Sequence, residues 1–191
     1  MRAYMKMKFE QVESYPIWKT HLACGDLSEE IKLETVVDNT NRSNKYNLST
    51  NQPNISAIHQ YLLSDEFKQE VIDTILQYKL IERLYPPKFL NNMASYTKIG
   101  HCFHKQGNDN HRIHLDHRTN LAQGLIYFDK QHNALHSTRV HPRPGVTIES
   151  NTESGNGILI LNTENSWHEG GNLDTDDRYF VLYSLELNWK E

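Results

Sequence analysis

The sequence predicts a mainly β protein, a β-sandwich or jelly roll whose helices pack against one sheet. The second half of the 191-residue chain is a series of short apolar segments separated by turn residues, which is typical of many antiparallel strands. The segment before them, residues 55–84, has the apolar periodicity of helices instead. We expect a single domain, residues 1–191, with helical support at about 55–85 and a barrel core at about 90–187.

The N-terminal part has weaker signals. Residues 1–37 are mixed, with a short strand-like piece at 31–37. Residues 38–54 are almost wholly polar and rich in Asn, Ser and Thr, which predicts a loop. This loop is either a solvated connector or a lid that grips a substrate, and the sequence leaves both open.

Residues 64–84 carry the clearest helical signal. Ser64 suits the N-cap position, and the two acidic residues after it suit the positive end of the helix dipole. An apolar stripe with spacings of four, four and three follows, formed by Phe67, Val71, Ile75 and Tyr78. The "YPP" at 85–87 ends the helix. A stripe of this kind is core material, so we assign it no chemistry.

After residue 90 we expect strands and no helix. The strand candidates are "MASYTKIGHCF", "RIHLDH", "AQGLIYFD", "STRVHP", "GVTIES", "GILILN" and "RYFVLYSLEL". The last of these has apolar residues on both alternating faces, so both faces are expected to be buried.

Composition excludes several classes of protein. The net charge of -4 leaves no basic surplus to neutralise the phosphates of a nucleic acid. No apolar run approaches the roughly 20 residues of a membrane span. The N-terminus shows no signal peptide, and the two distant cysteines form neither a metal pair nor a disulfide framework, so we expect a cytoplasmic protein. There is no nucleophile elbow, P-loop or dinucleotide-binding glycine fingerprint.

A histidine-rich stretch suggests a metal site. In "HRIHLDHRTN", residues 111–120, His114 and Asp116 lie two positions apart. If this stretch is a strand, both side chains project from one face, about 6.6 Å apart at their Cα atoms. A third ligand must come from elsewhere, and His168 is the best candidate. Two histidines and one carboxylate form the facial triad of non-haem Fe(II) oxygenases, although such ligands also bind zinc.

Arg178 begins the last apolar segment, ten positions after His168. A buried arginine is costly unless an anion pairs with it. The planar guanidinium is well suited to bind a carboxylate through two hydrogen bonds.

The pattern of "HLD" at 114–116, then His168, then Arg178 resembles that of the Fe(II)/2-oxoglutarate-dependent dioxygenases, in particular their prolyl-hydroxylase-like branch. The resemblance covers residues 90–187. It implies a double-stranded β-helix, and the use of Fe(II), 2-oxoglutarate and dioxygen to hydroxylate a peptidyl residue such as proline, or a small molecule. Succinate and carbon dioxide would be released.

The resemblance also implies roles for individual residues. His114, Asp116 and His168 would hold the iron, and Arg178 would bind the distal carboxylate of 2-oxoglutarate. A tyrosine that also contacts the cosubstrate would be Tyr96, on the strand before "HLD", or Tyr127, on the strand after it. Retention of an aspartate in the triad favours hydroxylation over halogenation.

The sequence departs from the family pattern in two places. Phe180 stands where many members have a serine two residues after the arginine, so another residue must supply the second hydrogen bond to the carboxylate. The common "GG-x-L" segment is absent from residues 129–145. Two alternatives therefore remain: a non-catalytic jelly-roll metal-binding or interaction protein, and a cupin-like metal-dependent hydrolase or isomerase.

Overall fold

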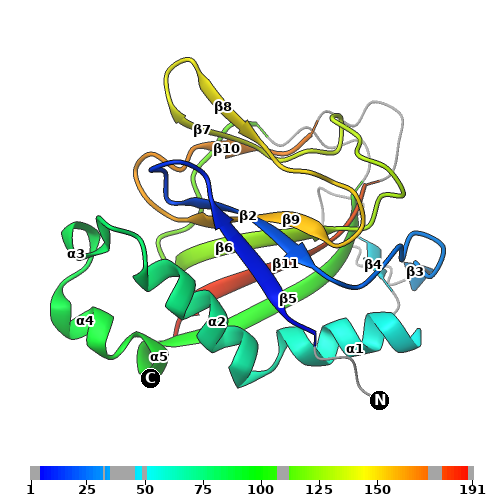
Figure 1. Ribbon diagram of the computed structural model, residues 1–191, viewed down its shortest axis with the longest axis horizontal. Coiled ribbons are helices and arrows are strands. Elements are labelled where there is room, and N and C mark those ends of the chain that lie inside the picture. Colours follow the sequence, from blue (N-terminus) through cyan, green and yellow to red (C-terminus); the bar gives the residue numbers. More distant parts are fainter. Residues whose placement is uncertain are drawn as a thin grey trace.

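The computed structural model describes residues 5–31, 33–34, 46–48, 51–106, 112–171 and 178–188. Most of the polar segment 38–54, and with it the choice between connector and lid, lies outside these residues. The described part contains two antiparallel sheets that face each other, with helices on the outer side of the larger one (Figure 1).

The larger sheet has eight strands in the order β1-β2-β9-β6-β11-β5-β4-β3. They are β1 (Met7–Gln11), β2 (Ile17–Leu22), β9 (Asn156–Leu161), β6 (Asn120–Tyr127), β11 (Arg178–Leu187), β5 (Thr97–Gln106), β4 (Tyr46–Leu48) and β3 (Leu33–Glu34). The smaller sheet has the order β10-β7-β8, from β10 (His168–Glu169), β7 (Arg139–Arg143) and β8 (Val146–Glu149). The predicted jelly roll is confirmed, as two facing sheets that do not close into a complete barrel.

Five helices are described: α1 (Pro53–Leu62), α2 (Asp65–Leu76), α3 (Ile81–Leu84), α4 (Pro87–Asn91) and α5 (Met93–Tyr96). The predicted N-cap is confirmed, because Ser64 Oγ accepts a hydrogen bond from the backbone N–H of Phe67 at 3.1 Å. The helix expected over 64–84 ends earlier, at Leu76. Tyr78 is nevertheless buried, with its ring edge-on to Trp18 at 6.4 Å between centroids. Within the described residues, no helix has the length and apolar character to cross a membrane.

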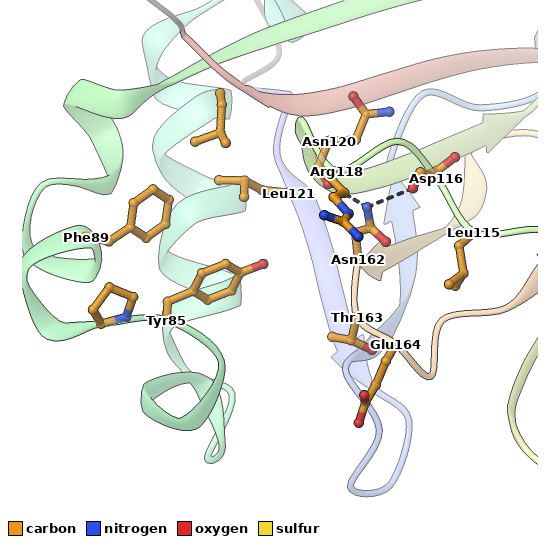
Figure 2. A pocket seen from close by; sticks show the side chains of 12 residues that line it. Tyr85, Phe89, Leu115, Asp116, Arg118, Asn120, Leu121, Asn162, Thr163 and Glu164 are labelled. Atoms are coloured by element: carbon orange, nitrogen blue, oxygen red, sulfur yellow. Dashed lines mark hydrogen bonds between the residues drawn. The ribbon is translucent and has the colours of Figure 1, made fainter.

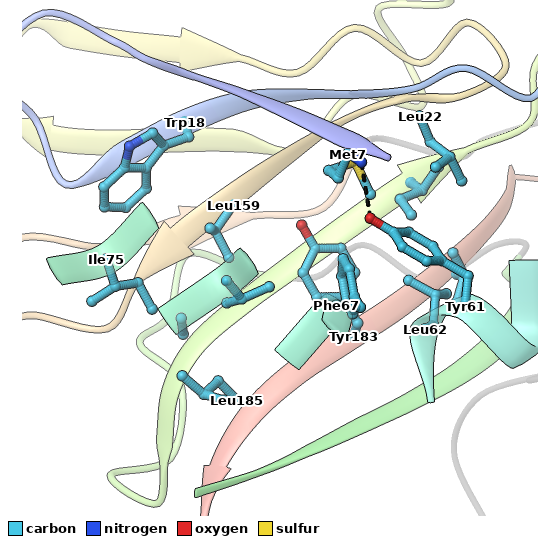
Figure 3. Packing of buried hydrophobic residues seen from close by; sticks show 14 of the residues in the cluster. Met7, Trp18, Leu22, Tyr61, Leu62, Phe67, Ile75, Leu159, Tyr183 and Leu185 are labelled. Atoms are coloured by element: carbon cyan, nitrogen blue, oxygen red, sulfur yellow. Dashed lines mark hydrogen bonds between the residues drawn. The ribbon is translucent and has the colours of Figure 1, made fainter. Parts of the chain in front are cut away.

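The outer face of the larger sheet forms the main core. Phe67 and Ile75 of α2 pack against strand residues that include Leu159, Tyr183 and Leu185 (Figure 3). All five are at most 1% exposed. Full burial of one such side chain stabilises the fold by about 1.5–3 kcal/mol. The assignment of the helical stripe to the core is confirmed.

A second apolar cluster lies on the inner face, between the two sheets. Its members include Tyr127, Val140, Ile158 and Phe180. Because side chains alternate along a strand, β11 contributes to both clusters, and its two faces are both largely buried, as predicted. The inner face of β11 begins with Arg178.

Two of the expected strands are wrong, and two strands were missed. The strand expected from residue 93 begins at Thr97, because residues 93–96 form α5. Residues 112–117 form no strand, since only an isolated bridge between His114 and His168 is present there. The strands β1 and β2 were not singled out in the sequence, because Met7–Gln11 and Ile17–Leu22 are short and carry polar residues throughout.

Candidate metal centre

Three side chains converge at one end of the space between the sheets. One ligand atom from each of His114, Asp116 and His168 lies within 4.8 Å of the other two. The backbone joins the two histidines directly, because the N–H of each donates to the carbonyl of the other, at 2.9 and 3.0 Å. The structure thus brings together the three residues that the sequence singled out.

Hydrogen bonds orient both imidazole rings in the same way. Nδ1 of His114 lies 2.8 Å from the carbonyl oxygen of Arg112, and Nδ1 of His168 lies 2.9 Å from that of Ser166. A carbonyl only accepts, so each Nδ1 carries the hydrogen and each Nε2 carries the lone pair. Such a bond to the other ring nitrogen is the usual support of a metal-binding histidine.

Burial keeps the distal histidine neutral. His168 is 4% exposed, and this burial lowers its pKa, while the nearby Asp116 carboxylate works in the opposite direction. Oδ1 of Asp116 lies 3.8 Å from Nε2 of His168. A neutral imidazole is the form that binds a metal. Two imidazole nitrogens and one carboxylate oxygen fit Fe(II), and also zinc.

Arg178 is the most unusual buried group of the described chain. It is 2% exposed, and its guanidinium lies over the rings of Phe180 and Tyr127, at 4.7 and 5.3 Å from their centroids. One terminal nitrogen donates to the Thr138 hydroxyl at 2.8 Å and to the Tyr127 hydroxyl at 3.1 Å. No carboxylate of the described residues forms an ion pair with it, and its Nε–H is buried without an acceptor. A buried cation in this state is costly, so the position is suited to an external anion.

A single cavity joins Arg178 to the three candidate ligands. Its volume is about 200 Å³, smaller than the roughly 300–1,000 Å³ of pockets for drug-sized ligands. It is lined by His114, Asp116, Gln123, Leu125, Thr138, His168, Gly170, Arg178, Phe180 and Leu182. A small molecule with an anionic group could therefore contact the guanidinium and a metal ion at the same time.

The structure separates the two candidate tyrosines. Tyr127 is fully buried, and its hydroxyl contacts Arg178, Thr138 and Ser150. Tyr96 ends helix α5, is 39% exposed and stacks on Phe89. Because Thr97 pairs with Leu187 and Gln106 pairs with Arg178, Tyr96 lies about 30 Å from Arg178 along the strands. The placement of Tyr96 on a strand beside the site is therefore wrong.

Thr138 was missed in the sequence. It is 2% exposed, lines the cavity, and its hydroxyl contacts both Arg178 and Tyr127. It offers the polar contact that Phe180 cannot supply. Nothing in "STRVHP" distinguishes this threonine, because its closeness to Arg178 depends on how the smaller sheet lies over the larger one.

A larger cavity of about 660 Å³ is lined in part by Asp116 (Figure 2). Its walls are mainly apolar and include Tyr85, Phe89 and Leu121, with the polar residues Arg118 and Glu164 among the remainder. Tyr85 stacks on Phe89, with 5.3 Å between ring centroids. Asp116 lines both cavities, so this larger space adjoins the candidate metal centre.

Comparison by sequence finds no matching family model and no matching curated protein. Comparison by structure finds clear similarity. A prolyl-4-hydroxylase from Pseudomonas putida has a TM-score of 0.52 at 16% identity, covering 86% of this chain and 82% of that one. A protein from Shewanella oneidensis, provisionally named an oxygenase, has a TM-score of 0.51 at 12% identity, covering 86% and 72%. At this identity the similarity shows the fold, and it confirms the fold that the resemblance implied.

Proposed function

We propose that this protein is an Fe(II)- and 2-oxoglutarate-dependent dioxygenase that hydroxylates its substrate and releases succinate and carbon dioxide. One observation carries the proposal: a single small cavity has the His114, Asp116 and His168 ligand set at one side and the buried Arg178, which has no acidic partner among the described residues, at the other. Two proteins that share the fold are named a prolyl-4-hydroxylase and an oxygenase, which supports the same class.

The three ligands would hold Fe(II), leaving coordination positions for the cosubstrate and for dioxygen, and the bound iron would supply the oxidising chemistry. The side chains that surround the iron have simpler tasks. The hydrogen bonds from Nδ1 of His114 and His168 to backbone carbonyls orient each ring and make Nε2 the ligand atom of the neutral imidazole. The cavity's apolar wall, formed by Leu125, Phe180 and Leu182, keeps bulk water away from it.

Arg178 would bind the distal carboxylate of 2-oxoglutarate. Its Nε–H has no acceptor of its own, and the carboxylate would supply one. The hydroxyls of Thr138 and Tyr127 both accept hydrogen bonds from the guanidinium. Tyr127 donates its own hydrogen to Thr138, so the Thr138 hydroxyl is the one that could donate to the same carboxylate. The negative charge would also neutralise a cation that is otherwise buried at a cost.

The acceptor substrate would enter from the larger cavity. Its volume of about 660 Å³ falls within the range of specific ligand pockets. The stacked rings of Tyr85 and Phe89 offer an apolar platform of the type on which proline-containing peptides bind. We therefore propose a peptidyl acceptor such as proline, with a small apolar molecule as the second choice.

The test is anaerobic absorption spectroscopy of the metal-free protein. Addition of Fe(II) and then 2-oxoglutarate should produce a visible charge-transfer band that appears only with both. His168→Ala should abolish the band, whereas His117→Ala, which changes an exposed histidine outside the ligand set, should preserve it. Succinate release with candidate peptides would then identify the acceptor.

Tight zinc binding without such a band would instead favour the metal-binding jelly roll or the metal-dependent hydrolase. In that case Arg178 would need another anionic ligand, and the proposal of a dioxygenase would fail.

A further inference from the structure

Asn162 lies directly after β9, between the two chain segments that carry the candidate metal ligands. Its side-chain amide nitrogen is 2.9 Å from the carbonyl oxygen of Asn120, 3.1 Å from that of His117 and 3.4 Å from that of Asp116. Figure 2 shows Asn162 beside Asp116 at the edge of the larger cavity. An amide group has two hydrogens, so the two shorter contacts are the stronger bonds.

The other end of the same side chain reaches toward the distal histidine. Oδ1 of Asn162 lies 3.4 Å from the Ser166 hydroxyl, which donates its single hydrogen mainly to the carbonyl of Thr163 at 2.7 Å. The carbonyl of Ser166 in turn accepts the hydrogen bond from Nδ1 of His168. The Asn162 side chain therefore bonds the turn that follows Asp116 and also lies against Ser166, whose carbonyl orients the ring of His168.

The segment that carries His114 and Asp116 needs such support. Residues 112–119 belong to no strand, and His114 makes only an isolated bridge. Asn120 N–H donates to the carbonyl of His117 at 2.9 Å, which closes a turn after the ligands. The carbonyls of this turn accept hydrogen bonds from the Asn162 amide. This side chain thus replaces the backbone hydrogen bonds that a neighbouring strand would supply.

We propose that Asn162 is a positioning residue that fixes the Asp116 segment relative to His168 and so presets the metal site. This inference rests on the proposed metal site, but the contacts that carry it belong to the protein without metal. Asn162 acts on the segment that carries Asp116 through the carbonyls of His117 and Asn120, and not as a metal ligand itself. Loss of groups that orient metal ligands commonly weakens metal binding about 10- to 100-fold.

The test compares Asn162→Asp and Asn162→Ala with the matched control Asn165→Asp. The aspartate keeps the shape but replaces the donor with an acceptor that faces three carbonyls, and alanine removes the group altogether. Asn165 lies in the same loop and is exposed. One readout is hydrogen exchange of the backbone amides of His114, Asn120 and His168 in the metal-free protein. The other is a titration with Co(II), followed by its visible absorption.

We expect both Asn162 variants to exchange these three amides faster and to bind Co(II) about 10- to 100-fold more weakly, with an altered Co(II) spectrum. Thermal stability should change little, and the Asn165→Asp control should match the wild type. If Asn162→Asp does not fold, Asn162→Ala carries the test, because water can reach this half-buried position and satisfy the carbonyls.

Wild-type exchange rates together with wild-type Co(II) affinity in both variants would overturn the inference. If the Asn162 variants exchange faster but the wild-type protein itself binds no Co(II), the positioning role of Asn162 is supported and the proposed metal function is refuted. The two failures are therefore distinguishable.

Discussion

The two faces of strand β11 differ in what they bury, since the outer face buries neutral side chains and the inner face buries a cation. On the outer face, Val181, Tyr183 and Leu185 pack under the helices and are at most 1% exposed. On the inner face, Arg178 is equally buried, yet it lacks an acidic partner among the described residues and keeps an N–H group without an acceptor. Ten consecutive residues thus carry a closed core on one side and an open cavity on the other.

This difference shows where the protein departs from optimal stability. The outer face buries neutral, mainly apolar side chains, although the Tyr183 hydroxyl there has no hydrogen-bond partner among the described residues. The inner face departs from this pattern at Arg178, and local departures of this kind are expected at functional sites. The comparison can be tested by changing one face at a time.

The largest effect is expected from Arg178→Met, which removes the cation but keeps much of the volume. Affinity for 2-oxoglutarate should fall by about 2–5 kcal/mol, because a buried charge pair with the carboxylate is lost. Thermal stability should stay the same or rise, since a buried charge without an acidic partner among the described residues is replaced by an apolar group. The checks are a 2-oxoglutarate titration of the Fe(II)-loaded protein and a thermal melt.

Arg139→Met is the matched control. Arg139 belongs to β7 of the smaller sheet, but its guanidinium is paired with Glu149 at 2.7 Å and is partly exposed. Arg139→Met should change the 2-oxoglutarate affinity and the stability of the protein by no more than about 1 kcal/mol each. A large fall in the melting temperature of Arg178→Met with unchanged cosubstrate affinity would mean that Arg178 is structural.

An intermediate effect is expected from a pair of glycines on opposite faces of the sheet. A Cβ atom on Gly124 would overlap the Tyr183 ring, whereas one on Gly100 would lie 3.4 Å from its nearest neighbour, Glu186 Oε1. Gly124→Ala should destabilise the protein by about 1–3 kcal/mol or more through overpacking. Gly100→Ala should be within about 0.5 kcal/mol of the wild type. Denaturant unfolding of both variants measures this, and equal effects would contradict the contrast between a packed and an open face.

The smallest effect concerns a histidine pair on the outer side. Nε2 of His101 lies 2.8 Å from Nδ1 of His59 in α1. Burial, and secondarily His59, lowers the pKa of His101 from 6.5 to about 4. The unfolded chain therefore takes up a proton at a higher pH than the folded chain does. This contribution makes stability fall as the pH drops from about 6.5 to 4, with no further loss below that.

Thermal melts at several pH values test this. His101→Gln should reduce the loss of stability between about pH 6.5 and 4. His117→Gln, at an exposed position, should leave this loss unchanged. An acid profile of His101→Gln identical to that of the wild type would show that another group controls the loss.

Several features could be read from the sequence because their signals are local. The helical stripe from Phe67 to Tyr78, the Ser64 cap and the strand at 178–187 all follow from side-chain spacing within one segment. The identity of the triad followed from residue type and from the family resemblance. The expectation that a strand presents His114 and Asp116 was wrong. The two residues lie in an irregular segment, and Asn162 bonds the turn that follows it.

The sequence by itself determined the class of fold, the main helix, the last strand and the residues His114, Asp116, His168 and Arg178. Only the tertiary structure decided between Tyr127 and Tyr96, brought Thr138 to Arg178 and placed Asn162 between the two halves of the site. The physical reason is the range of the interactions. Periodicity and capping act within a few residues, whereas these contacts join positions 40 to 51 residues apart, and they depend on sheet register and on how the two sheets face each other.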